Sequence, residues 1–474
     1  MSGLKYLSDP VHNFITLTEP ELHLIQAKSF QRLRSIKQLG LANYVYPAAD
    51  YSRLSHSLGV CHLTGLFLEN LKNEAGATIS QDEISRYRIA ALLHDIGHYP
   101  FSHAMEFSIK KFYSTKMLVP RTSKERTINE EYEKFYLHER VGKEILRSDG
   151  EIVKILHKHK IDPEEIYSIF LREKPLRFRN LISSDLDADR IDFLLRTSHH
   201  TGLPYGALDV MYLLSQVRLD LDGRICIHPK ALRTADHFLL ARYFDYQSVA
   251  YHKTVAGLEL VLKDIIAVLL ESGKVQCGAT DVRKLIRSGE WIHFDDARIF
   301  QAIFNLKKAT KISSLKLRTC AVLERIPPKL LVEYEEFALR NPASVQSFRM
   351  KKNRVDERIR DWAKRFGIKE DLWYLWQLPG QALTKIGSRI PMSTLENQDE
   401  ILNDEYDQSI RVFDPVTQKS KPITETDYSL MKLLSEQALF SLKLFILFPP
   451  DKIHLRSKIR EYIKEDLKDE ITWK

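Results

Sequence analysis

Residues 91–103, ALLHDIGHYPFSH, place three histidines and an aspartate at the end of an apolar run. The stretch before them predicts a helix that is apolar on nearly every side and therefore buried. A buried ionised carboxylate such as Asp95 needs a compensating partner, and a metal cation is a strong one. His94 and His98 share one face if the helix continues that far. The other interpretation is an exposed helix end at which His and Asp favour a turn.

A second acidic stretch, SSDLDADRIDFLLR at residues 183–196, supplies a candidate partner. Asp189 lies three residues after Leu186 and four before Phe193 on one helical stripe, so its carboxylate is expected to point toward the core. The other aspartates are expected to face solvent or to form ion pairs: Asp185, Asp187 and Asp192, the last with Arg196 at i,i+4.

His56, in SRLSHSLGV, precedes an apolar helical face. Alone, such a histidine is more often an ordinary core or surface residue. Together, however, His56, His94, Asp95 and Asp189 offer two imidazoles and two carboxylates. This mixed nitrogen and oxygen set suits a divalent ion with positions left for water and a phosphate. The residues leave Mn, Fe, Zn, Co, Ni and Mg open.

Composition limits the class of protein. The chain has 474 residues and a formal net charge of +8, which suits anionic partners without choosing among them. Its four cysteines form no CxxC pair, which argues against a disulfide framework and a thiolate zinc site. The first residues show no apolar signal region, so a cytoplasmic location is expected. Residues 439–448 are too short for a membrane span and predict a buried core helix.

Helical periodicity dominates up to about residue 275. A helix is expected to begin at Glu19-Pro20. Further helices are expected at 29–39, 54–71, 84–96, 137–147, 163–172, 179–198, 230–247 and 249–272, and a hairpin at 217–227 around Asp222-Gly223. Gly97 is expected to end one helix with a positive φ. Residues 111–136 predict a polar surface insertion. The fold class is mainly α, with a core at 1–275 and a smaller α+β region at 276–474, which includes a helix at 434–447 and serves oligomerisation or regulation.

Seven short sequence motifs, in this order along the chain, resemble those of one family. They are QRLRSIKQLG (31–40), YVYPAADYSRLSHSLGV (44–60), HDIGHYPFSH (94–103), LHERVG (137–142), LDADRIDFLLR (186–196), TGLPYG (201–206) and RYFDYQSVAYHK (242–253). Together they are similar to the HD-domain deoxynucleoside triphosphate triphosphohydrolases, over roughly residues 5–255. The resemblance implies an HD-domain helical core and hydrolysis of a dNTP to a deoxynucleoside and inorganic triphosphate.

The resemblance also implies roles for individual residues. His56, His94, Asp95 and Asp189 would hold the metal ion. Proton transfer and phosphate contacts fall to His98, His103, His138 and Glu106, with Glu106 orienting His103. Substrate contacts fall to Gln38, Leu39, Arg53, Arg190, Phe193, Arg242 and Lys253. A nucleotide effector site would use Lys5, Gln31 and Arg34. The implied partners are a nucleotide substrate, a second Mg²⁺ that arrives with it, and further copies of the chain in a dimer or tetramer.

The chain departs from the family at the nucleoside side. Phe193 and Ala250 stand where the family often has Tyr, and Thr197 stands where it often has the Asp that reads the 3′-hydroxyl. Gln26 replaces the Asp that reads guanine in vertebrate members. A buried site that loses a hydrogen-bond partner loses discrimination. We therefore hypothesise a broader or different nucleotide set.

Two other functions remain open at this point. The first is another HD activity, a nucleotidase or a phosphodiesterase, since a two-metal site can recruit His98 and His138. The second is a nucleic-acid-binding protein with a vestigial site, based on the basic segment 345–360. Acidic residues interleave its cations, and the segment carries no recognisable nucleic-acid motif.

Overall fold

A computed structural model describes residues 5–74, 78–116, 135–171, 177–178, 181–182, 184–382 and 408–474. Residues 117–134, most of the predicted insertion, lie outside this description. The chain forms two compact units that alternate along the sequence. The first comprises residues 1–241, 266–302 and 410–422, and the second comprises 242–265, 303–409 and 423–474. The assignment of the C-terminal region to oligomerisation or regulation stays a prediction.

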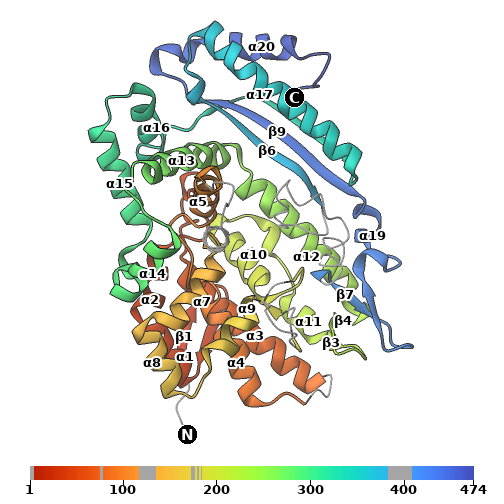
Figure 1. The fold of residues 1–474 in the computed structure, drawn as a ribbon. Coiled ribbons are helices and arrows are strands. Elements are labelled where there is room, and N and C mark those ends of the chain that lie inside the picture. The colour runs from red at the N-terminus through yellow and green to blue at the C-terminus, as the bar shows by residue number, and fades with distance from the viewer. Residues whose placement is uncertain are drawn as a thin grey trace, which may run out of the picture. The chain divides into compact units, whose positions relative to one another are not determined.

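The first unit is built on three packed helices (Figure 1). Helix α3 (Arg53–Glu74) packs against both α4 (Gln81–Leu93) and α10 (Ala188–Thr201). A hairpin of β1 (Lys5–Asp9) and β2 (Asn13–Leu17) precedes them and pairs Lys5 with Leu17. Further helices are α1 (Glu19–Gln26), α2 (Lys28–Gln31), α5 (His103–Lys116), α7 (His138–Ser148), α8 (Gly150–Lys158), α9 (Pro163–Leu171), α11 (Val210–Ser215) and α14 (Ala279–Ser288).

The predicted hairpin at 217–227 is confirmed. Strands β3 (Val217–Leu219) and β4 (Ile225–Ile227) pair in antiparallel fashion, and Gly223 takes a φ of 73° in the turn between them. Two late strands, β7 (Arg411–Phe413) and β8 (Ser420–Pro422), complete a four-stranded sheet in the order β3-β4-β7-β8. The division between the units falls within three helices: α12 (Leu232–Asp245), α13 (Lys253–Glu271) and α15 (Asp296–Ala309).

The second unit is centred on an antiparallel sheet in the order β5-β9-β6. Its strands are β5 (Lys329–Leu339), β6 (Trp373–Ala382) and β9 (Gln437–Ile446). Helix α17 (Pro342–Phe366) packs against β6, and α20 (Arg456–Asp466) against β5. Shorter helices are α16 (Ser313–Leu323) and α19 (Leu430–Leu434). The predicted fold class, a mainly helical chain with small sheets, is confirmed.

The predicted helix at 434–447, and with it the core helix at 439–448, is wrong. These residues form β9, the central strand, in which every residue after Gln437 is buried. A strand covered on both faces shows no alternation, so its apolar run cannot be told from a buried helix by periodicity. Lys443 is accommodated because its ammonium group donates to Tyr251 O at 3.2 Å and lies 3.0 Å from Glu333 Oε1.

Several other helix boundaries differ from expectation. The helix expected at 29–39 is α2, which ends at Gln31 and is followed by a 3-10 turn over Arg32–Ser35. Helix α4 ends at Leu93 rather than Ile96, and α10 begins at Ala188 rather than at 179. Asp187 starts α10, because its side chain accepts from the Arg190 N–H at 2.7 Å. Within the described residues, no helix is both long and apolar enough to cross a membrane.

Candidate metal centre

Three helices bring four predicted ligands together. His56 lies on α3, His94 and Asp95 follow α4, and Asp189 lies in the first turn of α10. One donor atom each from His56, His94 and Asp95 lies within 4.8 Å of the other two. Asp189 Oδ1 is 2.8 Å from His56 Nε2 and 3.9 Å from His94 Nε2. The convergence that the sequence predicted is therefore present in the structure.

The His94 ring is oriented for coordination. Its Nδ1–H donates to Ala91 O at 2.7 Å, which leaves the lone pair on Nε2. That Nε2 atom is buried and has no hydrogen-bond donor or acceptor partner among the described residues, yet it lies 3.2 Å from Asp95 Oδ1. A buried imidazole nitrogen aimed at carboxylate oxygens fits a metal ligand, since a cation would satisfy both.

His56 lies between two carboxylates. Its Nδ1 is 2.7 Å from Asp192 Oδ2, while Nε2 faces Asp189 Oδ1. Burial lowers the pKa of His56, but the hydrogen bonds to Asp189 and Asp192 outweigh it and raise that pKa to about 9. The surroundings thus favour positive charge at Nε2. A histidine whose second nitrogen bonds a carboxylate is the usual arrangement at a metal centre.

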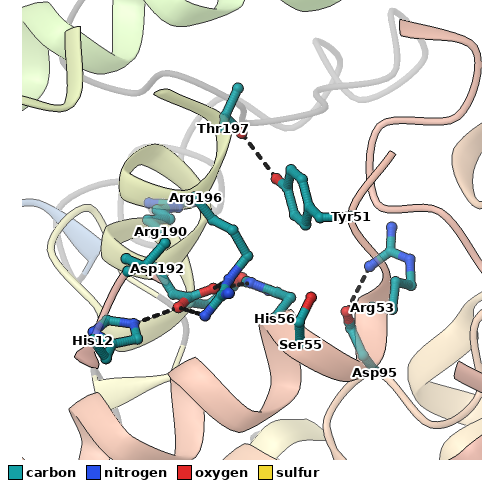
Figure 2. Close-up of polar contacts among 12 residues, drawn as sticks. His12, Tyr51, Arg53, Ser55, His56, Asp95, Arg190, Asp192, Arg196 and Thr197 are labelled. Carbon is teal, nitrogen blue, oxygen red and sulfur yellow. Dashed lines mark hydrogen bonds and ion pairs between the residues drawn. The ribbon is translucent and has the colours of Figure 1, made fainter. Parts of the chain in front are cut away.

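Asp192 connects His56 to the N-terminal hairpin (Figure 2). Its other oxygen is 2.7 Å from His12 Nε2, in the β1–β2 turn, and Arg196 donates to both oxygens at 2.9 and 3.0 Å. Arg196 also donates to Asp9 at 2.9 Å. The side chains of Asp192 and Arg196 are fully buried. This chain of ion pairs fixes the ring of His56, and sequence reasoning missed it apart from the Asp192–Arg196 pair.

The expected orientations of the aspartates on α10 are wrong in part. The Asp189 side chain is 36% exposed, whereas Asp192 is fully buried. The predicted stripe counted Leu186 as helical, but α10 starts two residues later. Asp185 and Asp187 are buried as well, Asp185 beside Arg190 at 3.0 Å. For Asp185 and Asp192, the ion-pair alternative holds rather than the solvent one.

Gly59 permits this close approach of α3 and α10. A Cβ atom at this position would lie 1.8 Å from Asp192 Oδ1 and 2.6 Å from Arg196 Nη2. Any larger side chain would displace the carboxylate that holds His56.

Asp95 has a cation behind it. Its Oδ2 accepts from Arg53 Nη1 at 2.6 Å (Figure 2). The Arg53 Nε–H also donates to Ser102 Oγ at 2.8 Å. Burial raises the pKa of Asp95, but Arg53, then His94 and His98, outweigh it and hold the pKa well below its usual range. Arg53 is buried beside Asp95, and its contact with a triphosphate stays a prediction.

A second cluster, formed by Glu106, His103, His138 and His98, adjoins Asp95. Glu106 accepts from His103 Nδ1 at 2.8 Å and from His138 Nδ1 at 2.7 Å. The His98 ring stacks on His138 with centroids 3.5 Å apart, and its Nε2 lies 3.1 Å from Asp95 Oδ1. Burial raises the pKa of Glu106, but His103 and His138 hold it well below its usual range. The predicted Glu106–His103 contact is present, and the contact with His138 is an addition.

Gly97 does not have the predicted positive φ. Its role is close approach instead, since a Cβ atom here would lie 2.1 Å from His138 O and 2.3 Å from Gly142 N. The glycine lets the first turn of α7 lie against the loop that carries Asp95 and His98. A glycine after a helix can serve either a positive φ or a close backbone approach, and the sequence alone does not distinguish these two roles.

The other predicted substrate residues are more dispersed. The Gln38 N–H donates to Tyr51 O at 3.0 Å, and Leu39 follows it. Arg190 donates to Ser184 O and to Asp185 Oδ1, and Phe193 is half-buried on α10. Arg242 and Lys253 belong to the second unit, so their contacts with a substrate stay predictions.

Two smaller features concern the sugar and the effector. The Tyr51 and Thr197 hydroxyls are 2.9 Å apart and buried, so the residue that replaces the family's aspartate bonds a protein hydroxyl (Figure 2). Of the predicted effector residues, Arg34 Nε donates to Gln31 Oε1 at 2.6 Å, and Lys5 lies in β1. A bound effector stays a prediction.

Known proteins are similar to this chain over the segment that carries the four candidate ligands. Residues 53–195 match the HD domain family. The uncharacterized protein MJ1154 of Methanocaldococcus jannaschii is 31% identical over 55% of this chain and 49% of its own length. A Dictyostelium discoideum homolog of the deoxynucleoside triphosphate triphosphohydrolase SAMHD1 is 28% identical over 55% of this chain and 48% of its own.

A crystal structure of a phosphohydrolase from Bacteroides thetaiotaomicron has the same fold. It superposes with a TM-score of 0.66 at 23% identity and covers 94% of this chain and 100% of that chain. This chain spans about half the length of the curated relatives it matches.

Proposed function

We propose that this protein is a metal-dependent phosphohydrolase that cleaves deoxynucleoside triphosphates to a deoxynucleoside and inorganic triphosphate. The observation that carries the proposal is the convergence of His56, His94 and Asp95 within 4.8 Å, with Asp189 Oδ1 2.8 Å from His56 Nε2. The finer substrate assignment is supported by similarity to a relative named as a deoxynucleoside triphosphate triphosphohydrolase.

In this proposal His56, His94, Asp95 and Asp189 hold one divalent ion. Two nitrogens and two oxygens suit a first-row divalent ion such as Mn²⁺, Fe²⁺ or Zn²⁺. When bound, such an ion polarises a phosphoryl oxygen and lowers the pKa of a bound water. Arg53 keeps Asp95 ionised, and Asp192 keeps His56 in the orientation that presents Nε2.

Glu106, His103 and His138 would supply the proton that the leaving group needs. The P–O5′ bond breaks as water adds to the α-phosphorus, so the 5′-oxygen must receive a proton. The His103 side chain is 48% exposed and its Nδ1 bonds Glu106, so this ring combines a stabilising carboxylate with access to solvent. The Glu106 carboxylate stabilises the imidazolium form, and we assign the donor role to His103.

We propose a nucleotide preference broader than that of the family. The Thr197 hydroxyl already bonds Tyr51, and Phe193 offers no hydroxyl. Both weaken recognition of the sugar. A panel of dNTPs, NTPs and monophosphates tests this, and strict preference for the four dNTPs over NTPs would refute it. Arg190, Arg242 and Lys253 remain our candidates for the triphosphate, Lys5, Gln31 and Arg34 for an effector, and a homo-oligomer for the assembly.

The main test combines metal analysis and product identification for wild type and Asp189→Ala. We expect wild type to retain a metal ion and to release triphosphate. Asp189→Ala should lose both the ion and turnover, because the cluster loses a carboxylate, while its helical circular dichroism persists. Asp82→Ala, on the exposed first turn of α4, is the matched control. Full activity of Asp189→Ala without metal would contradict the proposal.

One observation favours a second candidate function. Donor atoms of Asp95, His98 and His138 also lie within 4.8 Å of one another, and Asp95 belongs to both clusters. A carboxylate shared in this way can bridge two ions, as in two-metal phosphohydrolases. Two ions per chain, with orthophosphate or a nucleoside monophosphate as product, would identify a nucleotidase or phosphodiesterase instead.

A further inference from the structure

Two imidazoles face each other in the first unit, in a place that the proposed reaction does not use. His23 Nδ1 and His159 Nε2 are 2.8 Å apart, and the ring centroids lie 5.0 Å apart with planes tilted by 32°. Glu19 adds a carboxylate, and one donor atom from each of the three residues lies within 4.8 Å of the other two. This group, the α1–α8 cluster, joins residues that are 136 positions apart in the chain.

Local structure places each member. Glu19 and His23 lie at i,i+4 on α1, so their side chains share one face of the helix. His159 follows the last residue of α8, and its N–H donates to Ile155 O at 3.2 Å. Lys160 then takes a φ of 55°, which ends the helix. The His159 backbone is therefore held at the C-terminal end of α8.

Other contacts fix the two elements relative to each other. Helix α1 packs against α8 (Figure 1). In α2, which follows α1 in the chain, Ser29 Oγ donates to Asp149 Oδ2 at 2.5 Å and the Lys28 N–H donates to Glu151 Oε2 at 2.9 Å. The histidines are thus brought together by packing and capping contacts that do not involve them, so little ordering is needed when a ligand binds.

We propose that Glu19, His23 and His159 form a second divalent metal site, separate from the HD centre. Two imidazole nitrogens with one carboxylate oxygen favour Zn²⁺, Ni²⁺ or Cu²⁺, with water completing the coordination. The carbonyl end of α8 favours a cation there, while the neighbouring Lys158 and Lys160 oppose it. The site would tie α1 to α8 and so brace the hairpin end of the first unit. It does not depend on the proposed hydrolysis.

Zn²⁺ stoichiometry tests the proposal by equilibrium dialysis of the full chain. His23→Gln and His159→Gln should each bind one Zn²⁺ fewer than wild type. His157→Gln, an exposed histidine on the same helix, should bind the wild-type number. The same difference of one ion is expected in an Asp95→Ala background, so failure of the HD centre to bind metal does not affect this test.

Cu²⁺ electron paramagnetic resonance identifies the ligands. In the Asp95→Ala background we expect nitrogen hyperfine coupling from two imidazoles, reduced to one in either glutamine variant. Should one variant fail to fold by circular dichroism, the other and Glu19→Gln, which should weaken Zn²⁺ binding, carry the test. Equal Zn²⁺ stoichiometry and unchanged spectra in wild type and both histidine variants would overturn the proposal and leave a simple histidine–histidine hydrogen bond.

Discussion

Asp192 and Glu106 are two buried carboxylates that each hold two imidazoles, yet their surroundings differ. Asp192 bonds His12 and His56 and is also held by Arg196, all of them well buried. Glu106 bonds His103 and His138, and the His103 side chain is 48% exposed. Because Arg196 is a permanent cation, it holds the Asp192 carboxylate in place beside His56. A carboxylate whose partner imidazole reaches solvent can instead assist a proton that moves.

The comparison separates two tasks that sequence spacing alone merges. Asp192 bonds His56, and Glu106 lies 3.6 Å from His98. In the proposed function, Asp192 supports a candidate metal ligand and Glu106 supports the proton donor. The distinction predicts opposite outcomes for metal content and turnover when each carboxylate is neutralised.

Glu106→Gln should reduce kcat by about 10²–10⁴-fold while metal content stays at the wild-type level. Glu139 and Glu106 raise the pKa of His138 against the lowering effect of burial. Removing one of them lets this pKa fall, so the protonated form is lost at a lower pH. Glu106 bonds His103, the assigned donor, as well as His138, so its loss destabilises both imidazolium forms, and the alkaline limb of the pH–rate profile should move to lower pH. Loss of metal from this variant would show that Glu106 supports the ion rather than the proton.

Asp192→Asn should weaken metal affinity by about 10–100-fold, because His56 loses the carboxylate that orients it. Turnover should return largely at saturating metal, measured by titration of activity with the ion. Asp236→Asn, another buried carboxylate near an arginine, is the matched control. Unchanged metal affinity in Asp192→Asn would remove the contrast with Glu106.

Gly59→Ala and Gly97→Ala test the same contrast at two close contacts: Gly59 faces Asp192, and Gly97 faces the His138 backbone. Each should lower the free energy of unfolding by about 1–3 kcal/mol, because each new Cβ meets atoms closer than 2.5 Å. Gly59→Ala should mainly weaken metal binding, and Gly97→Ala should mainly lower kcat. Gly150→Ala, where a Cβ meets nothing within 4 Å, should be neutral in chemical denaturation. Equal loss in all three variants would contradict this reading of the two contacts.

The helical core and the convergence of the four candidate metal ligands could be predicted from the sequence for definite reasons. Amphipathic periodicity marks α7 and α9. The ordered motifs link His56, His94, Asp95 and Asp189 despite their separation along the chain. The hydrogen bonds that hold His56 could not be predicted, because His12 and Asp192 are 180 positions apart and hairpin packing brings them together. The strand β9 was missed because burial of both faces hides its period.

The basic segment 345–360 shows a similar limit. It forms part of α17, where most of its cations pair with acidic residues: Lys351 with Glu336, Lys352 with Asp356, Arg354 with Glu470, Arg358 with Asp466 and Arg360 with Glu370. Charge counted along the sequence does not reveal such pairs. They favour a structural role for the segment over a nucleic-acid-binding one.

Anomalous diffraction from crystals grown with Mn²⁺ tests the central claim most directly. We expect a peak bounded by Nε2 of His56, Nε2 of His94 and carboxylate oxygens of Asp95 and Asp189. An ion that binds elsewhere, with these four side chains left uncoordinated, would contradict the account.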